Sequence, residues 1–415
     1  MSRDFISQLE QRLSSVSLAL IQRAGALAAE HQLGIYLVGG VVRDILLGRA
    51  NSDLDLVVEG SAIKLAEALA GEVGGRLVVH RRFGTAKICT GNLTIDLAMA
   101  RAETYARPGA LPSVRPGSIR DDLARRDFTV NAIALRLGPT NLGNLVDPFD
   151  GQKDLDSKLI RILHDRSFID DATRMLRAVR YEQRFGFRLE AATEKLLRQN
   201  VVMLRTISGD RTRHELELIL KEERPEKALE RAGDLGLLGE VHPALEGDGW
   251  LKNVFEKARG AAVRPSPALY FALLTYRFNE PECEDFIARL KMPSAVSRST
   301  RDTVRLRGRM PLLDAPDLPP SGVTELLQEY SPTSILACAI AADSALVQER
   351  LDLYLTRWRH VRTALDGSAL QKLGVRSGHR LGEMLKALKD AKRDGKIESR
   401  EDEVELVQRW LSQGR

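Results

Sequence analysis

Apolar and polar positions change their period along the chain, and the change separates a short helical start, a strand-rich block and a long helical remainder. Apolar residues recur at helical spacing over 5–31, which predicts one helix there. Short runs rich in β-branched residues follow, with helices expected at about 41–47 and 62–73 between them. The expected strands are 35–38, 54–58, 77–80, 86–89 and 93–97.

The strand signal mostly disappears after Gly151, and helical patterns continue from there. The pattern therefore predicts a mixed α/β domain over roughly 33–145, followed by helices. Within that domain, 105–117 holds three prolines and two glycines and is expected to be a long loop. Four prolines over 311–322 mark the last expected domain boundary.

Composition narrows the class of protein. An apolar content of 43% and a charged content of 29% in 415 residues are typical of a globular, water-soluble protein. The net charge of +5 leaves an ordinary solvated surface and a polyanionic partner both open. Three cysteines without a CxxC spacing favour a reducing cytoplasm, and no apolar run is long enough for a membrane span. No signal peptide is expected.

A double glycine and a pair of carboxylates give the first chemical indication. Gly39 and Gly40 precede a helix, whose N-terminus attracts phosphate, and Arg43 in its first turn opposes the helix dipole unless an anion is bound. Asp53 and Asp55 point to the same face of a strand, where they repel each other unless a cation lies between them. Alone, the pair could be a solvated turn; beside the glycines it indicates a Mg²⁺ clamp for nucleotidyl transfer.

Two further positions extend this candidate site. Asp96 lies on another expected strand, where it could activate the nucleophile or complete the metal shell, or form an ion pair with Arg101. Arg126 precedes an expected helix cap at Asp127 or Thr129, before a helix over 130–134, and suits phosphate or ribose.

An acid and three arginines recur every three residues later in the chain. Asp171, Arg174, Arg177 and Arg180 would form one polar stripe of an amphipathic helix. The stripe could be a solvated face with an Asp–Arg pair. Alternatively, a carboxylate that accepts and a guanidinium that donates complement cytosine and adenine, and oppose uracil and guanine.

These motifs, in this order, resemble those of the class II tRNA nucleotidyltransferases, the CCA-adding enzymes and bacterial poly(A) polymerases of the polymerase β superfamily. The similar segments are 37–44 with Asp53-Leu-Asp55, 125–132, 147–154 and 170–174, and Arg211 with Glu215 is similar to the family's motif E.

The resemblance implies an α+β fold with a polymerase-β-like head that contains a mixed sheet, followed by an all-α neck, body and tail. It implies Asp53 and Asp55 as Mg²⁺ ligands, Gly40, Arg43 and Arg126 as triphosphate and ribose contacts, and Asp171 with Arg174 as the base-reading pair. Arg177 and Arg180 match further nucleotide contacts. The expected parts are an N-terminal helix (1–32), head (33–165), neck (166–225), body (226–310) and a tRNA-binding tail (311–415).

The implied activity is addition of CCA to the 3′ end of tRNA from CTP and ATP, with the body and tail binding the acceptor and TΨC arms. The full segment from Arg101 to Pro112 favours competence to add A. An A-only enzyme, a poly(A) polymerase and a catalytically idle RNA-binding protein remain as alternatives. A metal phosphohydrolase built on His164-Asp165 is another, although His164 is interpreted as structural. The sequence is silent on oligomeric state.

Overall fold

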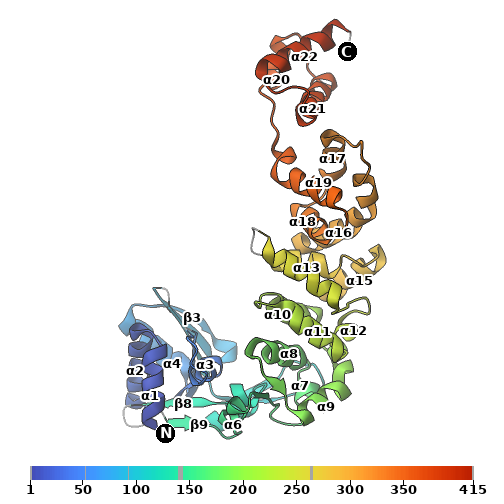
Figure 1. Ribbon diagram of the computed structural model, residues 1–415. Coiled ribbons are helices and arrows are strands. Elements are labelled where there is room, and N and C mark those ends of the chain that lie inside the picture. Colours follow the sequence, from blue (N-terminus) through green and yellow to red (C-terminus); the bar gives the residue numbers. More distant parts are fainter. Residues whose placement is uncertain (1, 52, 92, 139–143, 262–264, 414–415) are drawn as a thin grey trace. The chain divides into compact units, whose positions relative to one another are not determined.

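A seven-stranded mixed sheet forms the first part of the computed structural model, which describes residues 2–51, 53–91, 93–138, 144–261 and 265–413 (Figure 1). The strand order is β3-β4-β5-β2-β1-β8-β9; β2 and β5 run parallel, and the other neighbours are antiparallel. The strands are β1 (Gly34–Val38), β2 (Leu54–Glu59), β3 (Arg76–His80), β4 (Thr85–Thr90), β5 (Leu93–Met99), β8 (Ala134–Leu137) and β9 (Asn144–Val146).

One face of this sheet is covered by α2 (Ser15–Glu30) and α4 (Ala62–Val73), which pack against each other and against the strands (Figure 1). The single helix predicted over 5–31 is wrong, because the chain breaks into α1 (Ser2–Arg12) and α2. The break follows from a cap: the Ser14 side chain accepts a hydrogen bond from the Ser17 backbone N–H at 3.1 Å and starts the second helix.

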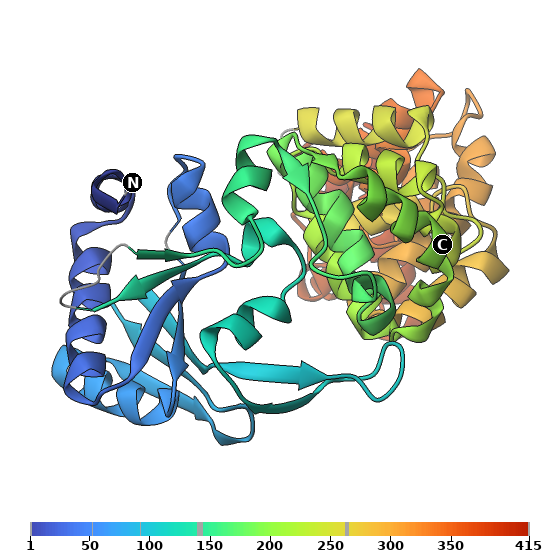
Figure 2. The same ribbon diagram turned by 90° about the horizontal axis from the view of Figure 1, so that it is seen from below.

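A two-stranded hairpin of β6 (Arg101–Thr104) and β7 (Ser113–Pro116) extends away from the sheet (Figure 2). The loop predicted over 105–117 is therefore wrong at its end, since 113–116 pairs with β6. Proline is tolerated in β7 because a two-stranded ribbon leaves one edge of each strand unpaired. The tip approaches η3 (Val201–Thr206): a Cβ on Gly109 would lie 2.7 Å from the Thr206 carbonyl oxygen.

The helix predicted over 130–134 is also wrong. A short 3₁₀ turn, η2 (Thr129–Asn131), is followed at once by β8. The Asp127 side chain accepts from the Phe128 backbone N–H and the Asn131 side chain instead of capping a helix, and β8 pairs with β1. The elements that follow the hairpin are α5 (Ile119–Ala124), α6 (Gly151–Asp156), α7 (Ser167–Asp170), α8 (Thr173–Phe185), α9 (Ala191–Asn200) and α10 (Gly209–Leu220), with β10 (Leu159–Ile160) paired to β11 (Arg188–Leu189).

The contacts divide the chain into two compact units, 1–223 with 231–241 and 224–230 with 242–415. The predicted α+β class, a mixed-sheet head followed by helices, is confirmed. The later helices are α11 (Pro225–Asp234), α12 (Leu237–Val241), α13 (Gly249–Gly260), α14 (Pro267–Leu274), α15 (Glu280–Leu290), α16 (Ser294–Leu313), α17 (Pro320–Leu327), α18 (Pro332–Ala341), α19 (Ala345–Thr356), α20 (Gly367–Lys372), α21 (His379–Arg393) and α22 (Arg400–Ser412), with the 3₁₀ turn η4 (Trp358–His360).

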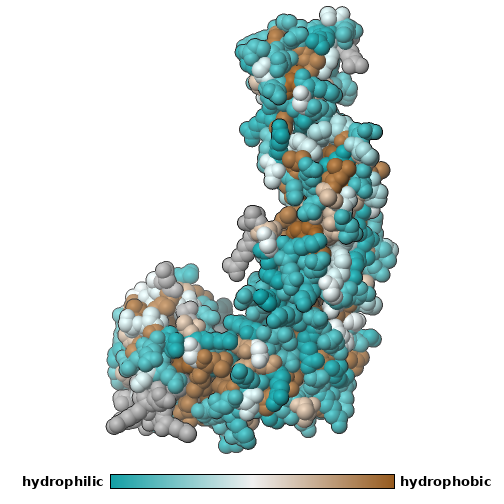
Figure 3. Space-filling model, viewed as in Figure 1, coloured by the Kyte–Doolittle hydropathy of each residue, from teal (hydrophilic) through white to brown (hydrophobic). Residues whose placement is uncertain are grey.

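Two hydrophobic clusters support the second unit. One runs from Leu306 to Trp358, so the boundary predicted at 310/311 falls inside it, and the other runs from Leu365 to Val407. The surface of these helices is mainly hydrophilic on the face drawn in Figure 3. No helix of the described residues is both long and apolar enough to cross a membrane. The division of the chain into five parts stays a prediction.

Candidate active site

A cavity of about 760 Å³ opens within the first unit, beside the start of β2 and the start of α3 (Gly40–Leu46). Its other walls come from the hairpin, from the segment between α5 and β8, and from α8 and α10. Most of the residues singled out from the sequence line it, namely Gly40, Arg43, Asp53, Asp55, Arg126, Asp171, Arg174 and Arg177. Asp96 and Arg180 are not among the lining residues.

The carboxylates of Asp53 and Asp55 are exposed, while Leu54 between them is buried, so both point to the side of the sheet that bears the cavity. Asp55 lines the cavity, where the surrounding protein partly desolvates its carboxyl and raises the pKa; Arg126 lowers the pKa, and the charges of Asp96 and Asp53 raise it further. Paired oxygen ligands whose charges repel each other fit a divalent cation. The described residues contain no cluster of three or more His, Cys, Asp and Glu arranged for metal binding.

Asp96 lies directly opposite Asp55 in the parallel ladder between β2 and β5. Its carboxylate forms an ion pair with Lys87 of β4 at 3.0 Å, which raises the pKa of Lys87. The predicted alternative pair with Arg101 is wrong, because Arg101 binds Glu103 instead. The register explains the difference: Lys87 faces Asp96 across the strands, whereas Arg101 belongs to the hairpin beyond β5.

The glycine turn is packed against Arg126. Gly39 has a φ of 75°, and a Cβ there would lie 2.7 Å from Arg126 Nη1. Arg126 Nη2 donates to Asp122 Oδ2 at 3.1 Å, and its Nε is buried without a partner among the described residues. Arg126 also lines the cavity, and a guanidinium beside a narrow glycine turn suits an anionic oxygen. Asp122, which also binds Arg125, was missed in the sequence.

Arg43 is buried and already held by the protein. Its Nε donates to Asp44 Oδ1 at 2.9 Å and its Nη1 to Asn131 Oδ1, and its guanidinium lies 4.5 Å from the centre of the Phe185 ring. The sequence predicted an external anion here. The Asp44 carboxylate of the protein itself takes the place of that anion. Arg43 therefore holds the cavity wall in position as well as lining it.

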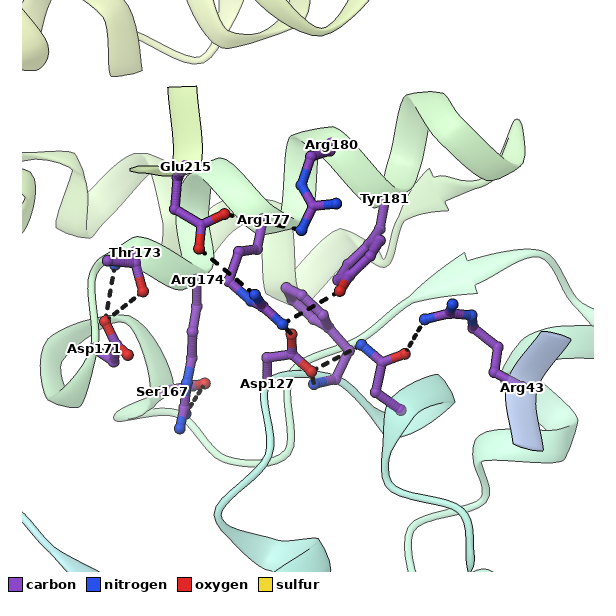
Figure 4. A network of polar contacts seen from close by, with 12 residues as sticks. Arg43, Asp127, Ser167, Asp171, Thr173, Arg174, Arg177, Arg180, Tyr181 and Glu215 are labelled. Atoms are coloured by element: carbon purple, nitrogen blue, oxygen red, sulfur yellow. Dashed lines mark hydrogen bonds and ion pairs between the residues drawn. The ribbon is translucent and has the colours of Figure 1, made fainter. Parts of the chain in front are cut away.

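Asp171 and Arg174 come from different elements, so the prediction of one helical stripe is wrong for Asp171. Asp171 follows α7 in an extended conformation, while Arg174 belongs to α8 (Figure 4). Asp171 accepts from the Thr173 backbone and hydroxyl groups at 3.0 and 2.6 Å, and Arg211 Nη2 lies 2.7 Å from both of its oxygens. Arg174 donates to the Ser167 hydroxyl and the Arg125 carbonyl, both at 2.7 Å.

Arg177 and Arg180 are bound by carboxylates of the protein itself (Figure 4). Arg177 donates to Asp127 Oδ2 from Nε at 2.9 Å and from Nη2 at 2.6 Å, and lies 3.5 Å from Glu215. Burial alone would raise the pKa of the Asp127 carboxyl, but Arg177, Asn131 and Arg174 together outweigh burial and the pKa is lowered. Arg180 is buried and paired with Glu215 and Glu222.

Asp127 therefore joins the head to α8, a role that the sequence did not reveal. Its other oxygen accepts from Asn131, which binds Arg43. The available signal was the occurrence of Asp127 and Asn131 in an otherwise apolar run, 127–135, because polar side chains in a core segment must find partners there.

Models of known protein families match two segments of the chain. A family model described as the poly A polymerase head domain matches residues 35–161. A second, described as a probable RNA and SrmB-binding site of polymerase A, matches residues 186–248.

Similar proteins cover nearly the whole chain. The A-adding tRNA nucleotidyltransferase of Halalkalibacterium halodurans is 33% identical over 99% of the chain and 96% of its own length. That of Geobacter sulfurreducens is 35% identical over 98% of the chain, which spans about half (48%) of that longer relative. A structure of the Thermotoga maritima CCA-adding enzyme with tRNA matches 98% of each chain at 31% identity, with a TM-score of 0.80. The chain belongs to the tRNA nucleotidyltransferase family.

Proposed function

We propose that the protein adds AMP from ATP to the 3′ end of tRNA without a nucleic-acid template, releasing pyrophosphate. The observation that carries the proposal is that Asp53, Asp55, Asp171 and Arg174 all line one cavity. One pair suits phosphoryl chemistry and the other suits the edge of a base. The A-adding relatives support the terminal A as the nucleotide added.

The proposed base-reading role rests on the donors and acceptors of Asp171 and Arg174 that remain after their hydrogen bonds within the described residues. Asp171 Oδ1 receives Thr173 and Arg211, whereas Oδ2 receives only Arg211 among the described residues, so Oδ2 can accept from an exocyclic amino group. Arg174 uses Nη1 and Nη2 in the hydrogen bonds to Ser167 and Arg125 and keeps further N–H groups for a ring nitrogen. Adenine and cytosine offer that combination, and uracil and guanine oppose it.

The phosphate end lies between the glycine turn and the carboxylates. Arg126 offers its guanidinium to a triphosphate oxygen, and Gly39 keeps the turn narrow. Asp53 and Asp55 would hold Mg²⁺, and Asp96 is the candidate third carboxylate. A divalent cation supplies charge neutralisation at the phosphates and lowers the pKa of the attacking hydroxyl. The 3′ hydroxyl of tRNA attacks the α-phosphorus in line, and the arginines stabilise the developing charge.

Addition of all of CCA, from CTP as well as ATP, is the second candidate. It is supported by the likeness to a CCA-adding enzyme over nearly the full length of both chains. The complete hairpin of β6 and β7 favours addition of A, which both candidates include.

Single-nucleotide incorporation tests these proposals. The protein is incubated with Mg²⁺, one nucleoside triphosphate at a time, and tRNA that ends before CCA, after C or after CC. Addition of A to tRNA ending in CC is expected. Added C on the shorter acceptors would establish the second candidate, long A tails would indicate a poly(A) polymerase, and no incorporation on any acceptor would overturn the proposal in favour of an idle RNA-binding protein.

Asp53→Ala is expected to abolish incorporation, a loss of at least about 10³-fold, because the carboxylate pair is broken. Binding of tRNA, measured by filter retention, should stay close to that of the unaltered protein. Glu67→Ala on the exposed side of α4 is the matched control and should retain activity. Retained turnover with lost tRNA binding in Asp53→Ala would refute the metal assignment.

A further inference from the structure

The sheet face that bears Asp55, called the inner face here, is left without a buried cover on β3, β4 and β5 among the described residues. Where β1, β2 and β8 present Tyr36, Val57 and Ala134, the face is buried in a hydrophobic cluster with α5. On β3, β4 and β5 the opposite face packs on α4, with Ala86, Ile88, Ile95 and Leu97 buried. The inner-face residues of these three strands are all exposed or half-buried: Arg76, Val78, His80, Thr85, Lys87, Cys89, Thr94, Asp96 and Ala98.

This uncovered face adjoins the carboxylates but lies outside the cavity assigned to the nucleotide. Asp55, Asp96 and Lys87 stand in one row across β2, β5 and β4, because their backbones are directly paired. Asp55 lines the cavity, whereas Asp96 and Lys87 do not. The row therefore leads from the reaction centre away from the nucleotide.

Nucleotidyl transfer also needs the acceptor RNA, whose attacking hydroxyl must lie on the side of the carboxylates away from the nucleotide. The attacking hydroxyl approaches the α-phosphorus opposite the leaving pyrophosphate, so the acceptor end and the triphosphate occupy different sides of the same carboxylates. β4 lies two strand spacings from β2, roughly 10 Å. An acceptor whose 3′ hydroxyl lies over Asp53 and Asp55 therefore has the open face of β5 and β4 within reach of its last phosphodiester.

Lys87 has the chemistry to receive that phosphodiester. Its side chain is 46% exposed, and of its three N–H groups one is taken by Asp96, the partner that the described residues provide. Arg76 lies on the same face: Val78 of β3 is paired with Lys87, and Arg76 is two residues before Val78. The positive charge of Lys87 also offsets the repulsion that the carboxylates of Asp96 and Asp55 would exert on a phosphate.

We propose that Lys87 binds the 3′-terminal phosphodiester of the acceptor RNA and that the acceptor end binds on the uncovered face of β3, β4 and β5. The proposal rests on the proposed function and deepens it, since it separates an acceptor subsite from the nucleotide cavity. Lys87 acts on the acceptor directly and positions Asp96 beside the attacking hydroxyl.

The test compares two acceptors in AMP addition, tRNA ending in CC and the same tRNA with an uncharged methylphosphonate at its last linkage. Lys87→Ala is expected to raise the KM for normal tRNA about tenfold and to leave the KM for ATP unchanged. The uncharged linkage should raise the KM of the unaltered protein for tRNA by a similar factor. It should raise the KM of Lys87→Ala for tRNA little further, because the contact with that phosphate is already absent. Lys87→Arg should recover most of the affinity.

Lys64→Ala is the matched control, since Lys64 is an exposed lysine of α4 on the covered side of the sheet. It should respond to the uncharged linkage like the unaltered protein. Equal sensitivity of Lys87→Ala and unaltered protein to that linkage would overturn the acceptor subsite, as would a fall in kcat alone. These outcomes require an unaltered protein that labels tRNA, so they are distinct from failure of the proposed function, in which nothing is labelled.

Discussion

Individual residues at the cavity are held by partners from remote parts of the sequence. Asp171 is fixed by Arg211, and Arg177 by Asp127. The sequence indicated that Asp171 and the arginines were chemically special, because an acid and three arginines recur at a regular spacing. It could not indicate the partners, since each pair bridges 40 to 50 residues and depends on how the helices pack on the head.

Replacement of Asp171 tests base reading. Asp171→Ala is expected to reduce the preference for A over U and G by about 5- to 150-fold, the range for losing one good base contact of about 1–3 kcal/mol. The measurement is the ratio of kcat/KM values for each triphosphate on the same tRNA. Asp170→Ala, the neighbouring acid, serves as the control, and an unchanged ratio in Asp171→Ala would show that the base is read elsewhere.

The pair of Asp127 and Arg177 predicts a dependence of stability on pH. The pKa of Asp127 is lowered in the folded protein, so the unfolded chain binds the proton more readily. Its contribution to stability is present above the unfolded pKa of about 4 and is lost as the pH falls through the folded pKa.

Asp127→Asn should lower the free energy of unfolding at pH 7 by about 3–5 kcal/mol, because Arg177 is left without its main partner. It should also flatten the loss of stability below about pH 4. Urea unfolding at pH 7, 5 and 3.5 measures both effects, with the exposed Asp156→Asn as the control. A variant as stable as the unaltered protein at pH 7 would contradict this role.

At the scale of the elements, the hairpin of β6 and β7 supplies part of the cavity wall. Glu103 near its base and Tyr105 at the start of its turn line the cavity, and Tyr105 donates to Glu103 at 2.9 Å. Proline and glycine content predicted irregular backbone throughout 105–117, but pairing with β6 overrides that tendency at β7. Strand pairing is a non-local property, whereas turn propensity is local.

Removal of 105–112, with Thr104 joined to Ser113 through a Gly-Gly turn, tests the hairpin. AMP addition to tRNA ending in CC is expected to fall at least about tenfold, because part of the cavity wall that Asp171 and Arg174 also line is lost. Addition of C, if present in the unaltered protein, should be spared. Equal loss of both reactions would refute a specific role in A addition, and a circular dichroism spectrum of the variant controls for its fold.

At the scale of the whole molecule, the second unit depends on two separate hydrophobic clusters. The cluster of 306–358 continues through the proline-rich segment in which the sequence suggested a boundary, while 365–407 forms its own core. Proline marks positions that a regular helix disfavours, yet packing decides where a core ends. Leu313 and Val323, on either side of the connection, are both fully buried in one cluster.

Leu388→Ala tests the independence of the last core. Removal of this fully buried side chain should destabilise the C-terminal helices by about 2–5 kcal/mol through the cavity that it leaves. Hydrogen exchange followed by mass spectrometry should show faster exchange over 365–411 and unchanged exchange over 306–358. The neighbouring exposed Lys389→Ala controls for position, and acceleration that spreads through both cores would show that they unfold together.

The sequence by itself determined what each short segment could form and which side chains could do chemistry. Alternation placed Asp53 and Asp55 on one face, and helical periods predicted helices such as α3 and α4, because both depend on neighbours a few residues apart. Only the tertiary structure decided the partners: Lys87 rather than Arg101 for Asp96, Arg211 for Asp171, and a strand rather than a helix after Asn131. The physical reason is that ladder register and helix packing bring distant residues together, and local patterns carry no record of those contacts.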